Sequence, residues 1–149
     1  CLLLLLSSQT AQAQTQANEE INCLSKAMYF EAFEGHEDSK KAVGWVLRNR
    51  LFNDYFPFSY CENIHWKTQF PWTNKGILNK KEWDRSLSVA TYMYYKGFFQ
   101  EEDPTHGSTF FASKEDGWFI HMIKTSQFEK KSEIGGHRYY FWKSKKVAD

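Results

Sequence analysis

The chain has 149 residues, 25% of them charged, and a formal net charge of +1 at pH 7. A chain of this length has room for one domain with a single hydrophobic core. Its charge is too close to zero to supply the basic field that nucleic-acid binding needs, so no nucleic-acid partner is expected. Aromatic residues make up 18% of the chain, more than one core of this size requires. We expect some of these rings to line a binding groove, because flat aromatic faces bind sugars well.

The chain starts with a run of leucines at residues 2–6, and the polar stretch after it ends in Ala-Gln-Ala at 11–13. This pattern is typical of a secretory signal peptide cleaved before Gln14. An initiating Met and a basic segment are missing, so residues 1–13 are interpreted as a partial signal peptide. The run is shorter than the roughly 20 residues of a membrane span, and no stable membrane span is expected. A retained N-terminal anchor, or a lipid on Cys1, stays open as an alternative.

Two cysteines follow the signal segment, Cys23 and Cys61. An even number of cysteines in an exported protein favours disulfide formation, because the compartments outside the cytosol are oxidising. We therefore expect a Cys23–Cys61 disulfide, with two buried free thiols as the alternative. The cysteines and the export signal together indicate a periplasmic or secreted protein, located at the cell wall or in the periplasm of a Gram-negative cell.

The first predicted helix begins near Asn18, because Asn is a favoured N-cap and acidic residues follow it. Leu24, Ala27 and Met28 recur at helical spacing, and Glu31 follows at i+7 from Leu24. This spacing places Glu31 in the middle of the apolar face of the helix.

Two further helices are predicted. One covers residues 38–53, and the other begins at Asn79, which forms a capping box with Glu82, and ends at Gly97. Residues 54–76 lie between them and contain two prolines and many aromatic residues without a clear period. We expect an ordered loop there with one helical turn, and long aromatic loops are usually functional.

Residues 108–113 and 137–142 are rich in aromatic residues and predict two paired strands. Helices followed by a small antiparallel sheet indicate the α+β class. We expect a linker at 14–18, one folded domain at 19–143 and a solvated tail at 144–149.

Glu31 is the strongest candidate for a catalytic residue. A carboxyl group among apolar side chains is poorly solvated, which raises its pKa and keeps a fraction protonated near neutral pH. Such a group is the usual general acid for breaking a glycosidic bond. The alternative is that Glu31 pairs with an arginine such as Arg48 or Arg50 and only stabilises the fold. Of the carboxylates close by in sequence, only Glu34 could flank Glu31, and these residues are interpreted as solvated helix-end residues. Without a partner carboxylate, one Glu can still carry out both proton transfers when the substrate supplies its own nucleophile.

Metal binding is not expected. The chain contains five histidines, but His36-Glu37 has no second histidine four residues after the first, as a His-Glu-x-x-His zinc site requires. We therefore predict no metal and no cofactor.

Several short motifs occur in a fixed order along the chain. They are Tyr29-Phe30-Glu31-Ala32, Ala42-Val43, Asn49-Arg50, Phe56-Pro57, Cys61, Gln69-Phe70-Pro71-Trp72-Thr73, Asp103-Pro104-Thr105, Phe110-Phe111 and Gly136-His137. This ordered set resembles the SleB-type cell-wall hydrolase family, which includes the spore-cortex-lytic enzymes and their relatives in Gram-negative bacteria and phages. The resemblance covers residues 20–142, nearly the whole predicted domain.

The resemblance implies a lysozyme-like fold and an enzyme that cleaves peptidoglycan between N-acetylmuramic acid and N-acetylglucosamine. It implies a lytic transglycosylase or a muramidase, acting as a monomer, with Glu31 as the acid/base. The motif positions expected to bind substrate are Gln69, Trp72, Thr105, Phe111 and His137, together with Glu34. Trp72 and Phe111 are expected to stack on sugar rings, and Gln69 and Thr105 to hydrogen-bond acetamido or hydroxyl groups.

The chain departs from the family pattern directly after the catalytic motif. The family usually continues with Arg-Gly-Glu, where this chain has Phe33-Glu34-Gly35. The departure keeps a second hypothesis open, a weakly active or inactive peptidoglycan-binding protein. A third hypothesis is a zinc-dependent amidase that cuts the peptide stems. For the leading hypothesis, either water or the muramic acid 6-hydroxyl can be the nucleophile, in a bacterium that remodels its own wall or in a phage.

Overall fold

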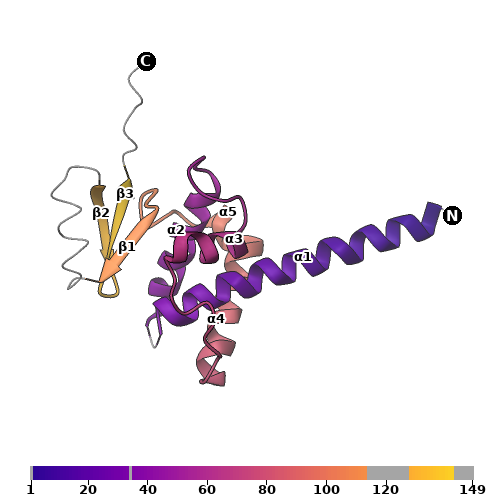
Figure 1. Ribbon diagram of the computed structural model, residues 1–149, viewed down its shortest axis with the longest axis horizontal. Helices are drawn as coiled ribbons and strands as arrows, with labels where there is room; N and C mark the ends of the chain where they lie inside the picture. Colours follow the sequence, from indigo (N-terminus) through magenta and orange to yellow (C-terminus); the bar gives the residue numbers. More distant parts are fainter. Residues whose placement is uncertain (1, 34, 114–127, 143–149) are drawn as a thin grey trace, which may run out of the picture.

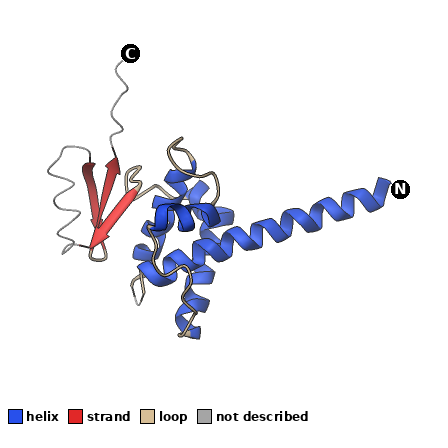
Figure 2. Cartoon of the chain, viewed as in Figure 1, coloured by secondary structure: helices blue, strands red, loops and turns tan. Residues whose placement is uncertain are grey.

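The computed structural model describes residues 2–33, 35–113 and 128–142 of the chain. Helices come first and a small sheet last (Figures 1 and 2). The helical part comprises α1 (Leu2–Glu31), α2 (Glu37–Leu51), α3 (Tyr60–His65), the 3₁₀ turn η1 (Trp66–Thr68), α4 (Lys80–Tyr92), the π-helical turn η2 (Met93–Gly97) and α5 (Phe98–Gln100). The strands are β1 (Phe110–Ser113), β2 (Phe128–Ile134) and β3 (His137–Trp142). The predicted α+β class is confirmed.

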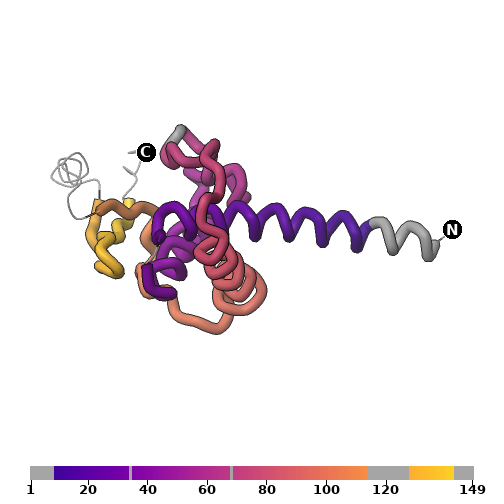
Figure 3. Tube along the Cα trace, turned by 90° about the horizontal axis from the view of Figure 1, so that it is seen from below, coloured from indigo at the N-terminus to yellow at the C-terminus, as the bar shows by residue number. Residues whose placement is uncertain are grey.

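Helix α1 is longer than the sequence pattern predicts. It runs unbroken from Leu2 to Glu31, so the predicted start at Asn18 is wrong, and residues 14–18, the predicted linker, are helical. No Pro or Gly interrupts this segment, and Leu, Ala and Gln are good helix formers. Figures 1 and 3 show the N-terminal part of α1 projecting away from the other helices. The signal-peptide boundary stays a prediction, and no helix among the described residues has the length and hydropathy to span a membrane.

The C-terminal half of α1 lies at the centre of the helical core. Leu24, Ala27 and Met28 have no exposed surface, as their helical spacing predicts, and they pack with residues of α2, α3 and α4. Cys23 of α1 and Cys61 of α3 form the predicted disulfide, with their Cα atoms 5.1 Å apart. The bridge fixes α3 against the helix that carries Glu31.

The region between α2 and α4 contains more helix than predicted. Residues 54–76 include α3 and η1, and the side chain of Ser59 caps α3 by accepting a hydrogen bond from the backbone N–H of Glu62. Asn79 caps α4 in the same way, as predicted, by accepting from the N–H of Glu82 at 3.0 Å. The third predicted helix changes to π-helical geometry over its last turn, Met93–Gly97.

The sheet has the strand order β1-β3-β2, and both pairings are antiparallel. The strand predicted at 137–142 matches β3, and the one predicted at 108–113 is shortened to β1. Sequence analysis missed β2, whose Lys, Glu and Ser residues lack apolar alternation and whose pairing is interrupted by an irregularity between Lys130 and Ser132. The tail predicted at 144–149 lies outside the described residues.

A glycine in the β2–β3 turn lets the sheet approach the helices. Gly135 has a φ of +56°, and a Cβ atom at this position would lie 1.9 Å from Oγ of Ser39, near the start of α2. Only glycine tolerates both the backbone angle and the contact. Tyr139 of β3 packs on Ala42 and Val46 of α2, so one face of the sheet covers α2. Figure 3 shows the sheet at the end of the molecule opposite the start of α1.

Candidate active site

Glu31 is the last residue of α1, and its side chain is half-buried. Burial raises the pKa of the Glu31 carboxyl above its ordinary value, because the charged form loses hydration. A hydrogen bond from Trp72 and the charge of Arg50 act in the opposite direction and are smaller. The sequence pattern predicts this desolvation, and the structure adds the two groups that stabilise the ionised form.

Trp72 contacts Glu31 directly. Its indole Nε1–H donates a hydrogen bond to Oε1 of Glu31. Trp72 is buried and stacks on Phe30, with ring centroids 5.0 Å apart and planes at 15°. One face of the indole is therefore already covered by a ring of α1, which differs from the predicted role of Trp72 as a platform for sugars. The structure shows Trp72 as a hydrogen-bond donor to the Glu31 carboxyl, and its contact with substrate stays a prediction.

Arg50 of α2 is a buried cation in the same region, with 2% of its surface exposed. Its guanidinium lies over the rings of Phe56, Phe70 and Phe110 at 4.8, 5.5 and 5.2 Å. Burial lowers the pKa of Arg50 to about 9, and the nearby charge of Glu31 partly offsets this. Nη1 of Arg50 is buried without a hydrogen-bond partner among the described residues. The arrangement keeps a positive charge close to Glu31 without a direct ion pair in the described part of the chain.

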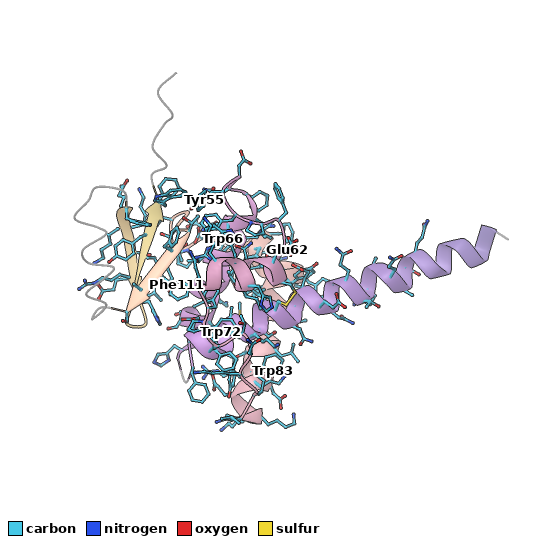
Figure 4. All side chains as sticks on the ribbon, viewed as in Figure 1. Tyr55, Glu62, Trp66, Trp72, Trp83 and Phe111 are labelled. Carbon is cyan, nitrogen blue, oxygen red and sulfur yellow. A yellow bond between two sulfur atoms is a disulfide. The ribbon has the colours of Figure 1, made fainter. Side chains whose placement is uncertain are left out.

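A chain of aromatic contacts joins this region to the sheet. Phe70 packs against Trp72 with ring centroids 5.2 Å apart and against Phe111 of β1 at 6.4 Å. Phe111 in turn meets the ring of His137 edge-on at 5.4 Å. Phe111 is half-buried. Its side chain and that of Trp72 can be followed in Figure 4. The structure therefore connects Trp72, Phe111 and His137 by ring contacts beside Glu31.

The two β3 residues nearest this region are poorly solvated. Burial lowers the pKa of His137, which favours its neutral form. Burial and the negative charge of Glu31 raise the pKa of Tyr139, so its hydroxyl keeps its proton. This hydroxyl is buried and has no hydrogen-bond partner among the described residues. Sequence analysis missed Tyr139, although it shares a strand face with His137 at the spacing of two.

The other predicted substrate-binding residues lie elsewhere or outside the described structure. Thr105 is fully buried, and its hydroxyl donates to Oδ1 of Asp103 at 2.6 Å. It holds the loop before β1, a position that does not match the predicted contact with substrate. Gln69 is exposed directly after η1. Glu34 lies outside the described residues.

Lys40 of α2 is a further residue that sequence analysis missed. It has no exposed surface, and its ammonium donates to the backbone oxygen of Ala32 at 2.9 Å and pairs with Oε1 of Glu82 at 2.5 Å. A cation at this point satisfies a carbonyl at the C-terminal end of α1. Lys40 thereby ties the end of α1, next to Glu31, to α2 and α4. Lys40 precedes the buried Val43 and Leu47 by three and seven residues, and this helical spacing could have predicted that Lys40 is buried as well.

The described residues hold no group of three or more His, Cys, Asp or Glu side chains placed to bind a metal ion. The described residues form an α+β fold in which the Glu31 carboxyl, with its raised pKa, lies beside aromatic side chains, an arrangement suited to acid–base chemistry.

The sequence matches the cell wall hydrolase family over residues 34–140, and the chain belongs to this family. The family is the SleB-type one that the ordered motifs resemble, so that prediction is confirmed. The match begins just after Glu31, which leaves the Tyr29-Phe30-Glu31-Ala32 motif outside it. No significant similarity to a curated protein or to a solved structure was found. As a cell wall hydrolase, the chain is an enzyme that acts on peptidoglycan, and its disulfide fits a cell-wall or extracellular location.

Proposed function

We propose that the chain cleaves the glycan strands of peptidoglycan between N-acetylmuramic acid and N-acetylglucosamine, as a lytic transglycosylase with Glu31 as its single acid/base. The observation that carries the proposal is the environment of Glu31. Burial raises the pKa of this carboxyl, while Trp72 and Arg50 stabilise the carboxylate that forms when the proton leaves.

In the first step, the protonated Glu31 gives its proton to the glycosidic oxygen as the bond to C1 of the muramic acid breaks. The Glu31 carboxylate accepts the hydrogen bond from the indole of Trp72 and interacts with the Arg50 cation. In the second step, the carboxylate removes the proton from the 6-hydroxyl of the same muramic acid as that oxygen bonds to C1. The product is a 1,6-anhydro sugar, and Glu31 is protonated again for the next cycle.

The choice of transglycosylation over hydrolysis rests on the neighbours of Glu31. A two-carboxylate glycosidase places its second carboxyl roughly 5 to 9.5 Å from the first. In the described part of the chain, the side chains that act on the pKa of Glu31 are Trp72 and Arg50, and neither is a carboxylate, while Glu34 lies outside that part. A mechanism in which Glu31 is the single acid/base suits a substrate that supplies its own nucleophile.

We assign the binding of the sugar rings beside the cleaved bond to half-buried and exposed residues near Glu31. Phe111 offers a ring for stacking, and Gln69 and His137 offer hydrogen-bonding groups. We assign the chain to the periplasm or to secretion, in line with the leucine run and the disulfide.

The deciding experiment is digestion of purified peptidoglycan by the chain, with the soluble fragments identified by mass spectrometry and the Glu31→Gln variant as the control. Fragments ending in 1,6-anhydromuramic acid, absent with Glu31→Gln, are the expected result. Fragments with reducing ends at muramic acid would mean that the chain hydrolyses the bond and is not a transglycosylase. A chain that sediments with the wall and releases nothing would be a peptidoglycan-binding protein instead.

A further inference from the structure

A pocket lies away from Glu31, between the middle of α1, the C-terminal end of α2, the start of α3 and the η2–α5 segment. Its volume is about 370 Å³, within the range of small-ligand sites. We name it the Arg48 pocket, and the lining residues that matter here are Glu20, Arg48, Phe58, Tyr60, Phe98 and Phe99. Glu20 lies on α1 about three turns, or roughly 16 Å, before Glu31. The pocket is thus separate from the candidate active site but carried by the same helix.

Exposed aromatic rings gather around this pocket. Phe58 and Phe99 line it with 77% and 72% of their surface exposed, and Phe52 nearby is 72% exposed. Exposed apolar side chains scattered singly are ordinary, but several gathered in one place mark a binding surface. These rings can cover the apolar part of a ligand without any change in the core.

Arg48 is the cation of the pocket. Its guanidinium lies over the rings of Phe52, Phe98 and Phe99 at 4.3, 5.7 and 5.5 Å. Across the described ranges, no carboxylate lies within 4.0 Å of Arg48. A planar guanidinium has five N–H donors and is suited to bind a carboxylate in two parallel hydrogen bonds. The charge of Arg48 therefore points to an anionic group on the ligand.

Glu20 supplies the opposite charge in the same pocket. Its Oε2 accepts a hydrogen bond from the backbone N–H of Tyr60 at 2.6 Å, which fixes the carboxylate in place. Among the described residues Glu20 and Arg48 form no ion pair with each other, so the pocket is lined by both a negative and a positive group. A ligand that carries both a carboxylate and an amine complements this arrangement.

We propose that the Arg48 pocket binds the peptide stems of peptidoglycan, with a stem carboxylate on Arg48 and a stem amine on Glu20. The stems combine carboxylates, amines and aliphatic side chains, and Phe58 and Phe99 cover the aliphatic part. Because stems branch from the glycan strand, one chain can hold a stem here while the strand reaches Glu31. The inference depends on peptidoglycan as the substrate class and is independent of which bond Glu31 cleaves.

The test measures binding by the whole chain carrying Glu31→Gln, so that digestion does not interfere. Co-sedimentation compares intact peptidoglycan with glycan strands whose stems an amidase has removed. Binding is expected to be about tenfold or more tighter to the intact wall, and Arg48→Gln is expected to remove most of that difference. Arg85→Gln, a matched change at a half-exposed arginine of α4, is expected to leave binding unchanged.

Binding of a soluble stem peptide tests which chemical groups the Arg48 pocket recognises. Calorimetry with the free tetrapeptide stem is expected to show binding, and the same peptide with its carboxylates converted to carboxamides is expected to bind about tenfold more weakly or not at all. Phe99→Ser provides a second variant, because an exposed ring can be replaced without unfolding the chain, and it should also weaken stem binding.

Three results would overturn the inference: equal binding to stripped strands, normal binding by Arg48→Gln, or equal binding of the carboxamide peptide. Failure of the proposed function would give a different experimental result. In that case the chain with Glu31 intact would release no fragments from the wall, while its stem binding would still depend on Arg48.

Discussion

The indole N–H of Trp72 donates a hydrogen bond to the carboxyl of Glu31, although 41 positions separate the two residues in the sequence. The contact joins the end of α1 to the loop after η1. It aligns the carboxyl and favours its ionised form, while burial of the same group favours the protonated form. The two opposing influences keep both protonation states accessible, as an acid/base that works in both directions needs.

Replacing Glu31 by Gln removes the acidic proton of the carboxyl group and keeps the shape of the side chain. The amide oxygen of the new side chain can still accept from Trp72, so the fold is expected to survive. Release of soluble fragments is expected to fall by about 10²- to 10⁴-fold. Glu102→Gln, a change at an exposed residue, is the control and should keep full activity. A fully active Glu31→Gln enzyme would remove Glu31 from the mechanism.

Replacing Trp72 by Phe deletes the hydrogen bond that lowers the pKa of Glu31. The pKa of Glu31 then rises further, so the carboxyl stays protonated to higher pH. Because the first step uses the protonated form, the fall in rate on the alkaline side is expected to move to higher pH. The measurement is the rate of fragment release against pH, with Trp83→Phe on α4 as a matched control. A shift of the alkaline limb to lower pH would contradict the assigned role of Trp72.

The raised pKa of Glu31 also predicts how stability changes with pH. Unfolding exposes the carboxyl and returns its pKa to about 4.5. The folded state therefore binds the proton more tightly than the unfolded state, and this contribution is complete below pH 4.5. It is lost as the pH rises through the folded-state pKa. Urea unfolding at about pH 4 and about pH 8 should show that Glu31→Gln gains stability relative to the parent at the higher pH. No gain would indicate a fully solvated carboxyl.

The Cys23–Cys61 disulfide closes a loop of 38 residues. In the chain-entropy description, such a bridge stabilises the fold by about 3 to 4 kcal/mol. Reduction, or the Cys23→Ala/Cys61→Ala variant, is expected to lower the melting temperature by roughly 6 to 15 °C. Thiol titration of the untreated chain is the accompanying control. Finding two free thiols and an unchanged melting curve would rule the bridge out.

The buried pair of Lys40 and Glu82 provides a double-mutant test. Lys40→Met leaves the buried Glu82 carboxylate with only Arg85 among the described residues, at 3.9 Å, and the chain is expected to lose about 3 kcal/mol of stability. Lys40→Met/Glu82→Met removes both charges and should recover most of this loss, measured by urea unfolding. If the double variant is as unstable as the single one, the hydrogen bond from Lys40 to Ala32, and not the ion pair, is the main contribution.

Sequence periodicity by itself determined the local features of this protein. The spacing of Leu24, Ala27 and Met28 placed Glu31 on the buried face of α1, and Asn79 marked the start of α4. The order of short motifs identified the family. These features depend on residues close together in the chain, or on residue types alone, and both can be read without knowing the packing.

Tertiary structure alone decided which distant groups meet at Glu31. The Trp72 hydrogen bond, the buried Arg50 and the unpartnered hydroxyl of Tyr139 come from three separate segments of the described chain. Their distances depend on how α1, α2 and β3 pack, and no local pattern encodes that packing. The same reason explains the one strand that was missed, since β2 is polar in sequence and becomes a strand only by pairing with β3.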